Sequence, residues 1–150
     1  MLENVEGILR PFREGDESFY AWFEVCKAFA SIGYAPCPVF VNAKNAGVAQ
    51  NRPRFIMFAV RVDLVDALDA TTREFFEKGI RLVELLKHGD PKYDKDILPV
   101  LDLTNGGIER ARKTVFAPLI AFAEPDKHRS VEDAIRDLED ETRPPKSAYV

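Results

Sequence analysis

The sequence has little of what defines secreted, membrane-embedded or metal-stapled proteins. It contains only two cysteines in 150 residues, too few for a disulfide framework or a cysteine-rich zinc site. No apolar run approaches the ~20 residues that a membrane-spanning helix requires. Residues 1–10 lack the basic start and apolar core of a secretory signal. We therefore expect a cytoplasmic protein with reduced cysteines and no membrane partner.

The chain also lacks the basic excess that is typical of a free-standing nucleic-acid binder. Its formal net charge is −4 and its pI is about 5.3, whereas affinity for nucleic acid depends on neutralising phosphates with Lys and Arg. This balance argues mildly against a chain that grips DNA alone, but it permits a local basic loop on a larger assembly. The 46% hydrophobic and 31% charged residues are ordinary for one globular domain.

The first half of the chain alternates between strand and helix patterns. Residues 2–9 have the form of a strand end and the loop that leaves it. Apolar residues then recur at helical spacing from Ser18, the expected N-cap, to Gly33, the expected C-terminal glycine. Two β-rich runs follow, at 39–41 and 55–60, with a polar loop between them. This order predicts an α/β fold, a sheet layered with helices.

The second half has a mainly helical pattern. Thr71 and Glu74 match a capping box, and an apolar stripe follows them in a predicted helix that ends at Gly89. Another helical stretch, over 108–113, follows a Gly-Gly pair.

The last part of the chain predicts one more helix. Ser130 and Asp133 form a second capping box, for a helix that reaches Leu138. Residues 143–146 contain two prolines, which predict an extended and exposed tail.

A series of short segments carries the chemical information, because their order along the chain is more specific than any single one. The series is Glu3-Asn4-Val5, Ile32-Gly33-Tyr34, Val41-Asn42-Ala43 and Gly47-Val48-Ala49-Gln50-Asn51-Arg52-Pro53-Arg54, then the run 55–60 and Arg61. It resembles the DNA (cytosine-5) methyltransferase family. Members carry Glu-Asn-Val at a strand end, a helix closing on a Leu-Gly-Tyr-like turn, a strand closing on Asn-Ala, and a Gly-Val-Pro-Gln-x-Arg-x-Arg loop. This sequence departs from the pattern at Ala46, where an aromatic is common, and at Ala49, where proline is usual.

The resemblance implies the C-terminal part of a Rossmann-like, S-adenosylmethionine-dependent methyltransferase sheet with flanking helices, plus a helical extension. Residues 1–62 are then the second half of the catalytic domain. Residues 63–113 match no segment of the family that we can name, and we interpret them as a helical insertion. Residues 114–150, which include the family-like segment 130–138, form the passage toward a target-recognition domain that is absent.

The resemblance also implies roles for five side chains. Glu3 is similar to the acid that shares a proton with the cytosine ring while a thiolate adds at carbon 6. Arg52 and Arg54 resemble the pair that braces this acid and reaches the base carbonyl or a phosphate, acceptors that suit a planar guanidinium. Asn4 is similar to an asparagine that ties this loop to the nucleophile loop, and Gln50 to a contact with the DNA backbone. These groups would line the pocket of a flipped base.

Four elements of the family are missing from the sequence. They are the Gly-rich turn for S-adenosylmethionine, the acid that binds its ribose, the Pro-Cys-Gln turn that holds the nucleophile, and the asparagine-containing C-terminal element that completes the cofactor pocket. The Pro-Cys pair that ends at Cys37 comes after Glu-Asn-Val instead of before it, so we interpret Cys37 as a small buried or edge residue and Cys26 as core. His88 and His128 have no second ligand at metal spacing, and we expect both to be exposed.

Two functional hypotheses remain open. In the first, the chain is part of a DNA (cytosine-5) methyltransferase and is inactive alone. Its partners are then the missing N-terminal half or a partner subunit, and double-stranded DNA. S-adenosylmethionine binds only to the complete enzyme, and an exposed sheet edge permits a homodimer when no partner is supplied. In the second, the chain is a non-enzymatic remnant or interaction module derived from such an enzyme.

Overall fold

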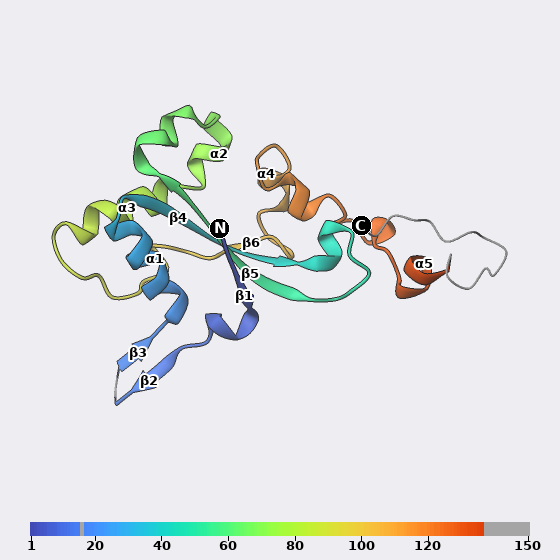
Figure 1. Cartoon of the computed structure of the whole chain (residues 1–150), viewed down its shortest axis with the longest axis horizontal. Coiled ribbons are helices and arrows are strands. Elements are labelled where there is room, and N and C mark those ends of the chain that lie inside the picture. The colour runs from blue at the N-terminus through green and yellow to red at the C-terminus, as the bar shows by residue number, and fades with distance from the viewer. Residues whose placement is uncertain (16, 137–150) are drawn as a thin grey trace, which may run out of the picture.

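The computed structural model describes residues 1–15 and 17–136, which form a mixed α/β fold around a four-stranded sheet (Figure 1). The strands lie in the order β1 (Leu2–Val5), β5 (Pro53–Arg61), β4 (Tyr34–Asn42) and β6 (Leu101–Asp102). β5 is antiparallel to both of its neighbours, and β6 is parallel to β4. The expectation of an α/β sheet with flanking helices is confirmed.

One face of the sheet is covered by α1 (Ala21–Ser31), whose apolar stripe follows the predicted helical spacing. Trp22 and Phe23 of this helix are buried against Phe55 and Met57 of β5. The helix ends as expected, because Gly33 adopts a φ of 83° and donates its N–H to a carbonyl of the last turn.

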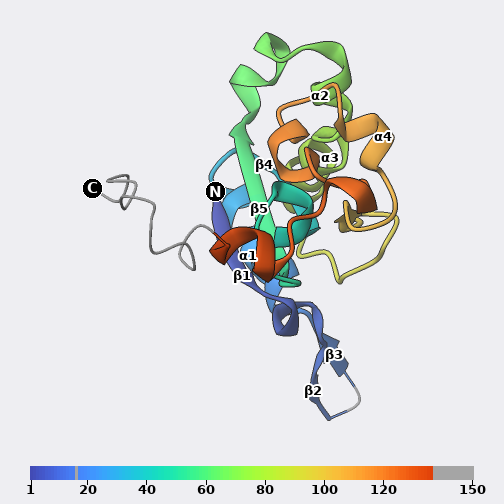
Figure 2. The ribbon, with the colours of Figure 1, turned by 90° about the vertical axis from the view of Figure 1, so that its right-hand side faces the viewer.

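The start of α1 was predicted wrongly. Ser18 lies in β3 (Glu17–Phe19), which pairs with β2 (Phe12–Glu14) in a hairpin that projects from the sheet (Figures 1 and 2). Ser18 pairs there with Arg13, so its backbone is extended and it lies two residues before the N-cap position. Tyr20 takes the N-cap position without a side-chain hydrogen bond.

The opposite face of the sheet is covered by segments from the second half of the chain. Side chains from β4 and β5 pack there against Phe76, Leu103 and Phe116. The covering elements are the 3-10 turns η3 (Val62–Ala67) and η4 (Ala117–Ile120) and the helices α2 (Ala70–Glu74) and α4 (Ile108–Ala111). The helix predicted over 108–113 is thus present as α4.

β4 is longer than the predicted run at 39–41, which stopped at two prolines. Backbone groups of residues two and four apart on a strand point to the same side, so those of Pro36 and Pro38 point the same way as those of Phe40. The carbonyl of Phe40 accepts from the N–H of Leu103 on the side away from β5. The two missing N–H groups therefore face the outer edge of β4, where they interrupt no bond to β5.

α3 (Glu77–Leu86) lies along the same edge of β4. A Cβ on its residue Gly79 would lie 2.2 Å from the carbonyl oxygen of Pro36. The bare Cα of Gly79 therefore allows the helix to approach the strand backbone directly, and Leu82, one turn later, is fully buried on the α1 side.

The capping box predicted at Thr71 and Glu74 is wrong. Asp69 caps α2, because its carboxylate accepts from the N–H of Thr72 at 2.9 Å. The expected single helix is divided into α2 and α3, and α3 ends at Leu86, before the predicted stop at Gly89.

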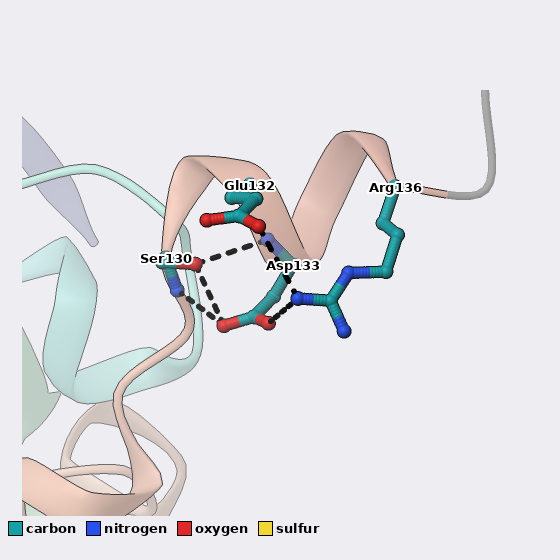
Figure 3. A network of polar contacts seen from close by, with 4 residues as sticks. All are labelled: Ser130, Glu132, Asp133 and Arg136. Atoms are coloured by element: carbon teal, nitrogen blue, oxygen red, sulfur yellow. Dashed lines mark hydrogen bonds and ion pairs between the residues drawn. The ribbon is translucent and has the colours of Figure 1, made fainter. Parts of the chain in front are cut away.

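The capping box at Ser130 is confirmed at the start of α5 (Val131–Ile135). The hydroxyl of Ser130 accepts from the N–H of Asp133 at 3.0 Å, and the Asp133 carboxylate accepts from the N–H of Ser130 at 3.1 Å (Figure 3). Arg136 closes the network on Glu132 and Asp133. The predicted continuation to Leu138 and the tail at 143–146 lie outside the described residues.

Two further observations bear on the sequence predictions. No helix in residues 1–15 and 17–136 is long and apolar enough to cross a membrane.

The predicted division at 1–62, 63–113 and 114–150 stays a prediction. Residues 63–113 supply β6 to the sheet as well as α2, α3 and α4.

Candidate functional site

The sheet brings together two of the residues predicted to act on a base. In the antiparallel pair of β1 and β5, Glu3 lies opposite Ile56 and Val5 lies opposite Arg54. Side chains two residues apart on a strand share a face, so Glu3 and Arg54 are diagonal neighbours on one face of the sheet. The Oε1 atom of Glu3 lies 2.7 Å from Nε of Arg54.

The two partners differ in burial. The side chain of Arg54 is 15% exposed and that of Glu3 is 54% exposed. Arg54 also donates from a terminal guanidinium nitrogen to the carbonyl of Pro53 at 2.8 Å, which fixes the cation from a second direction. The result is a held guanidinium beside a carboxylate that remains open to a further ligand.

Arg52 is placed differently from Arg54. It precedes the first residue of β5 and is exposed. Its backbone N–H donates to Oδ1 of Asn42 at 3.1 Å, which fixes the backbone while the side chain extends from the loop. The structure therefore brings Arg54 to Glu3 and leaves Arg52 at the end of the loop.

Asn4 and Gln50, the other two predicted site residues, are both exposed. Asn4 lies opposite Phe55, so its side chain is on the other face of the sheet from Glu3. Its carbonyl oxygen accepts from the N–H of Val5 at 2.8 Å. Gln50 lies in the loop before β5, where its N–H donates to the carbonyl of Val48 at 2.7 Å.

Asn42 has a structural part in the site that the sequence reasoning missed. Its side chain is 7% exposed and accepts from the backbone N–H groups of Lys44 and Arg52 at 3.2 and 3.1 Å. It also donates to Oδ1 of Asn51 at 2.7 Å. An asparagine at a strand end, before a loop, was the available signal, since its short side chain often replaces backbone partners in turns.

The two cysteines are buried and free, which confirms the interpretation that Cys26 and Cys37 are packing residues. Burial raises the pKa of the Cys37 thiol to about 12, and burial likewise raises the pKa of Cys26. A thiol that stays protonated at neutral pH is a poor nucleophile.

The histidines give no metal site. His88 is exposed as expected. The expectation is wrong for His128, which is half-buried and has an Nε2 atom with no partner. Within residues 1–15 and 17–136, no three His, Cys, Asp or Glu side chains are grouped to hold a metal ion.

A cavity of about 420 Å³ lies away from the Glu3–Arg54 pair, at the outer edge of β4 and β6. Its walls include Pro38, Phe75, Leu101 and the ion pair of Arg110 with Glu74. The charges around it have mixed sign and indicate no ligand class, so cavity size alone does not locate the chemistry.

The fold and the polar pair define a mixed α/β protein with an acid–guanidinium site at one edge of its sheet. Over residues 1–148 the chain matches the family described as C-5 cytosine-specific DNA methylase. The chain therefore belongs to this family, whose members act on DNA and normally use S-adenosylmethionine. Searches of curated proteins and of solved structures each returned no significant match.

The family match confirms the resemblance drawn from the motif series. It also extends over residues 63–113, which no motif had linked to the family.

Proposed function

We propose that this chain supplies part of the cytosine pocket of a DNA (cytosine-5) methyltransferase. The observation that carries the proposal is the contact of 2.7 Å between Glu3 and Arg54. It joins the Glu-Asn-Val segment to the Gln-x-Arg-x-Arg segment, which lie far apart in sequence. An acid beside a planar cation is a suitable group set for the edge of a pyrimidine, which carries both donors and acceptors.

In this proposal Glu3 is the acid that acts on the flipped base. When a thiolate adds at carbon 6 of cytosine, electron density moves onto the ring, and a proton shared between Glu3 and ring nitrogen 3 stabilises the adduct. The carboxyl group of Glu3 is half-exposed in this chain. A carboxyl group with this much free surface can be reached by the edge of a base that enters beside it.

Arg54 orients that carboxyl group and presents its remaining N–H groups to the carbonyl of the base. Arg52 and Gln50, which are exposed on the adjacent loop, are proposed to reach the carbonyl or the DNA phosphates. Asn4 is proposed to meet the loop that holds the nucleophile, from the other face of β1.

The nucleophile and the cofactor are assigned to a second part of the enzyme. S-adenosylmethionine supplies the methyl group when it is bound. None of the five proposed site residues belongs to a Gly-rich turn suited to it, so we assign it no contact with them. β1 is at one end of the described sheet. We propose that the cofactor-holding half, in a Rossmann-like sheet, pairs with the free edge of β1, and that a homodimer takes its place when it is missing.

Methyl transfer to double-stranded DNA tests the proposal. The chain is assayed with labelled S-adenosylmethionine, alone and with a polypeptide that carries the Gly-rich turn and the Pro-Cys-Gln turn. We expect no transfer by the chain alone and transfer by the pair. Transfer by the chain alone, or equal transfer by the pair with Glu3→Gln, would contradict the proposal.

The net charge of −4 favours one alternative, a non-enzymatic interaction module derived from such an enzyme. The module would bind a protein partner and not DNA, because an acidic chain repels phosphates. It predicts that the mixture with a cofactor-holding half stays inactive, and that the chain shows no salt-dependent binding to duplex DNA.

A further inference from the structure

The two ends of the loop that carries Gln50 and Arg52 are hydrogen-bonded to each other beside the end of β4. The N–H of Ala43 donates to the carbonyl of Arg52 at 3.0 Å, and the Asn42 side chain bonds the Arg52 N–H. These bonds fix where the loop begins and ends. In the turn between them, η2 (Ala43–Ala46) and Gly47, the same Asn42 oxygen accepts from the N–H of Lys44, and residues 45–47 lie beyond these bonds to Asn42 and Arg52.

That turn is held by a segment that comes much later in the chain. The carbonyl of Asn45 accepts from the N–H of Phe122 at 2.7 Å, and the Asn45 amide donates to the carbonyl of Leu103 at 3.3 Å. Asn45 is 2% exposed, so both bonds are sheltered from water. Leu103 is itself bonded to Phe40 of β4, which makes the anchor part of the sheet.

The ring of Phe122 completes the contact. A Cβ on Gly47 would lie 2.7 Å from the nearest ring carbon, so the ring lies directly on the bare Cα. Gly47 also has a φ of 85°, a conformation that side-chain-bearing residues rarely adopt. Glycine is therefore required twice at this position, once for the turn and once for the ring.

We propose that Phe122 is a positioning residue, which acts on the turn at Asn45 and Gly47 and so holds the loop that carries Gln50 and Arg52 in the geometry that the DNA requires. Only the effect on DNA binding rests on the proposed function, because Phe122 contacts Asn45 and Gly47 in the absence of DNA. Phe122 is half-buried and lies outside the Glu3–Arg54 pair. Its removal should loosen the loop while the two faces of the sheet stay packed.

Hydrogen–deuterium exchange on the full chain tests the positioning. Phe122→Ala should accelerate exchange about tenfold or more at the amides of Gly47 and Val48, which lie in the turn that the ring covers. Amides of α1 should keep their wild-type rates. Phe12→Ala, in the exposed hairpin, is the matched control and should leave the loop unchanged. Phe122→Tyr keeps the ring and should restore wild-type exchange.

Loop rates that are unchanged in Phe122→Ala would overturn the proposal, and so would an equal acceleration everywhere. If Phe122→Ala does not fold, Phe122→Leu provides the same test with a smaller loss of packing, and a local, intermediate acceleration is expected.

Kinetics of the complete enzyme give the second readout. Phe122→Ala should raise the KM for DNA about tenfold and change kcat less than about threefold, because the loop contacts DNA and not the reacting atoms. A fall in kcat at unchanged KM would contradict positioning. The two proposals fail separately: if Glu3→Gln is fully active, the cytosine role of the pair is wrong, while local exchange in Phe122→Ala still establishes the anchor.

Discussion

Glu3 and Arg54 face each other diagonally across two antiparallel strands, with 2.7 Å between Oε1 and Nε. Because the carboxylate is 54% exposed, solvent screens the pair, and its contribution to stability is at most about 1 kcal/mol. The contact therefore matters for where it places an acid and a cation, and not for holding the sheet together. Substitutions of the pair should therefore change the rate of methyl transfer and leave the free energy of unfolding nearly unchanged.

Arg54→Lys tests this separation. Lysine keeps the charge but loses the planar fork, so the carboxyl of Glu3 is no longer oriented. We expect a change of less than about 1 kcal/mol in the free energy of unfolding by urea. Methyl transfer by the completed enzyme should fall about 10- to 100-fold. Arg61→Lys, on the exposed end of the same strand, is the control and should retain full activity; a large loss there would indicate a general effect of the lysine.

Asn42→Ala should destabilise the chain by about 1–3 kcal/mol, since it leaves the N–H groups of Lys44 and Arg52 without their acceptor in a shielded site. Urea unfolding measures the effect. The control is Asn105→Ala, an exposed asparagine whose loss should cost less than about 0.5 kcal/mol. Equal effects of the two substitutions would show that the Asn42 bonds add nothing to the loop.

Gly79→Ala should also be destabilising, by about 1–3 kcal/mol, because the new methyl group would meet the backbone of Pro36 at 2.2 Å and force α3 away from β4. This loss has to exceed the gain of about 1 kcal/mol that alanine brings to a helix interior. In the control Gly106→Ala the new methyl group would lie 3.6 Å from the carbonyl oxygen of Asp102, an ordinary contact. A thermal unfolding midpoint that is unchanged in Gly79→Ala would disprove the close approach of α3.

The buried thiol of Cys37 should make stability depend on pH in the alkaline range. Its pKa is raised from 9.0 to about 12 in the folded chain, so the unfolded chain releases this proton first. The contribution of the protonated thiol to the free energy of unfolding is then complete below pH ~9 and decreases as the pH rises toward 12. Cys37→Ala removes this contribution, and the difference between the two urea titrations isolates it from lysine and tyrosine ionisation. Parallel curves from pH 8 to 11 would contradict a buried, protonated thiol.

Much of the sheet and of α1 follows from local sequence pattern, and the errors have local causes. The strand prediction at 39–41 stopped at Pro36 and Pro38. A strand tolerates a proline when its missing N–H faces the strand edge, and the sequence does not show which way that group faces. β6 has only two paired residues, too few to carry a periodic pattern. Ser18 is a good N-cap residue by type, but its pairing with Arg13 in the hairpin takes precedence.

The contacts of the site likewise include some that the sequence predicted and some that it did not. The motif series grouped Glu3 with both Arg52 and Arg54. The register of β1 against β5 brings Arg54 into contact with Glu3, whereas Arg52 lies in the loop before β5. The anchor at Asn45 and Phe122 had no sequence signal, because it joins residues far apart along the chain through a buried amide and a bare glycine. Such contacts depend on the path of the whole segment from η3 to η4, which no short window specifies.

The most direct test of the central claim compares Glu3→Gln with Glu6→Gln in the completed enzyme. Both substitutions replace an exposed acid by its amide, three residues apart, and only Glu3 lies beside Arg54. If Glu3 shares a proton with the flipped cytosine, its substitution should lower kcat about 10²- to 10⁴-fold and Glu6→Gln should have no effect. Equal activity of the two variants would show that the pair of Glu3 and Arg54 has no part in the chemistry.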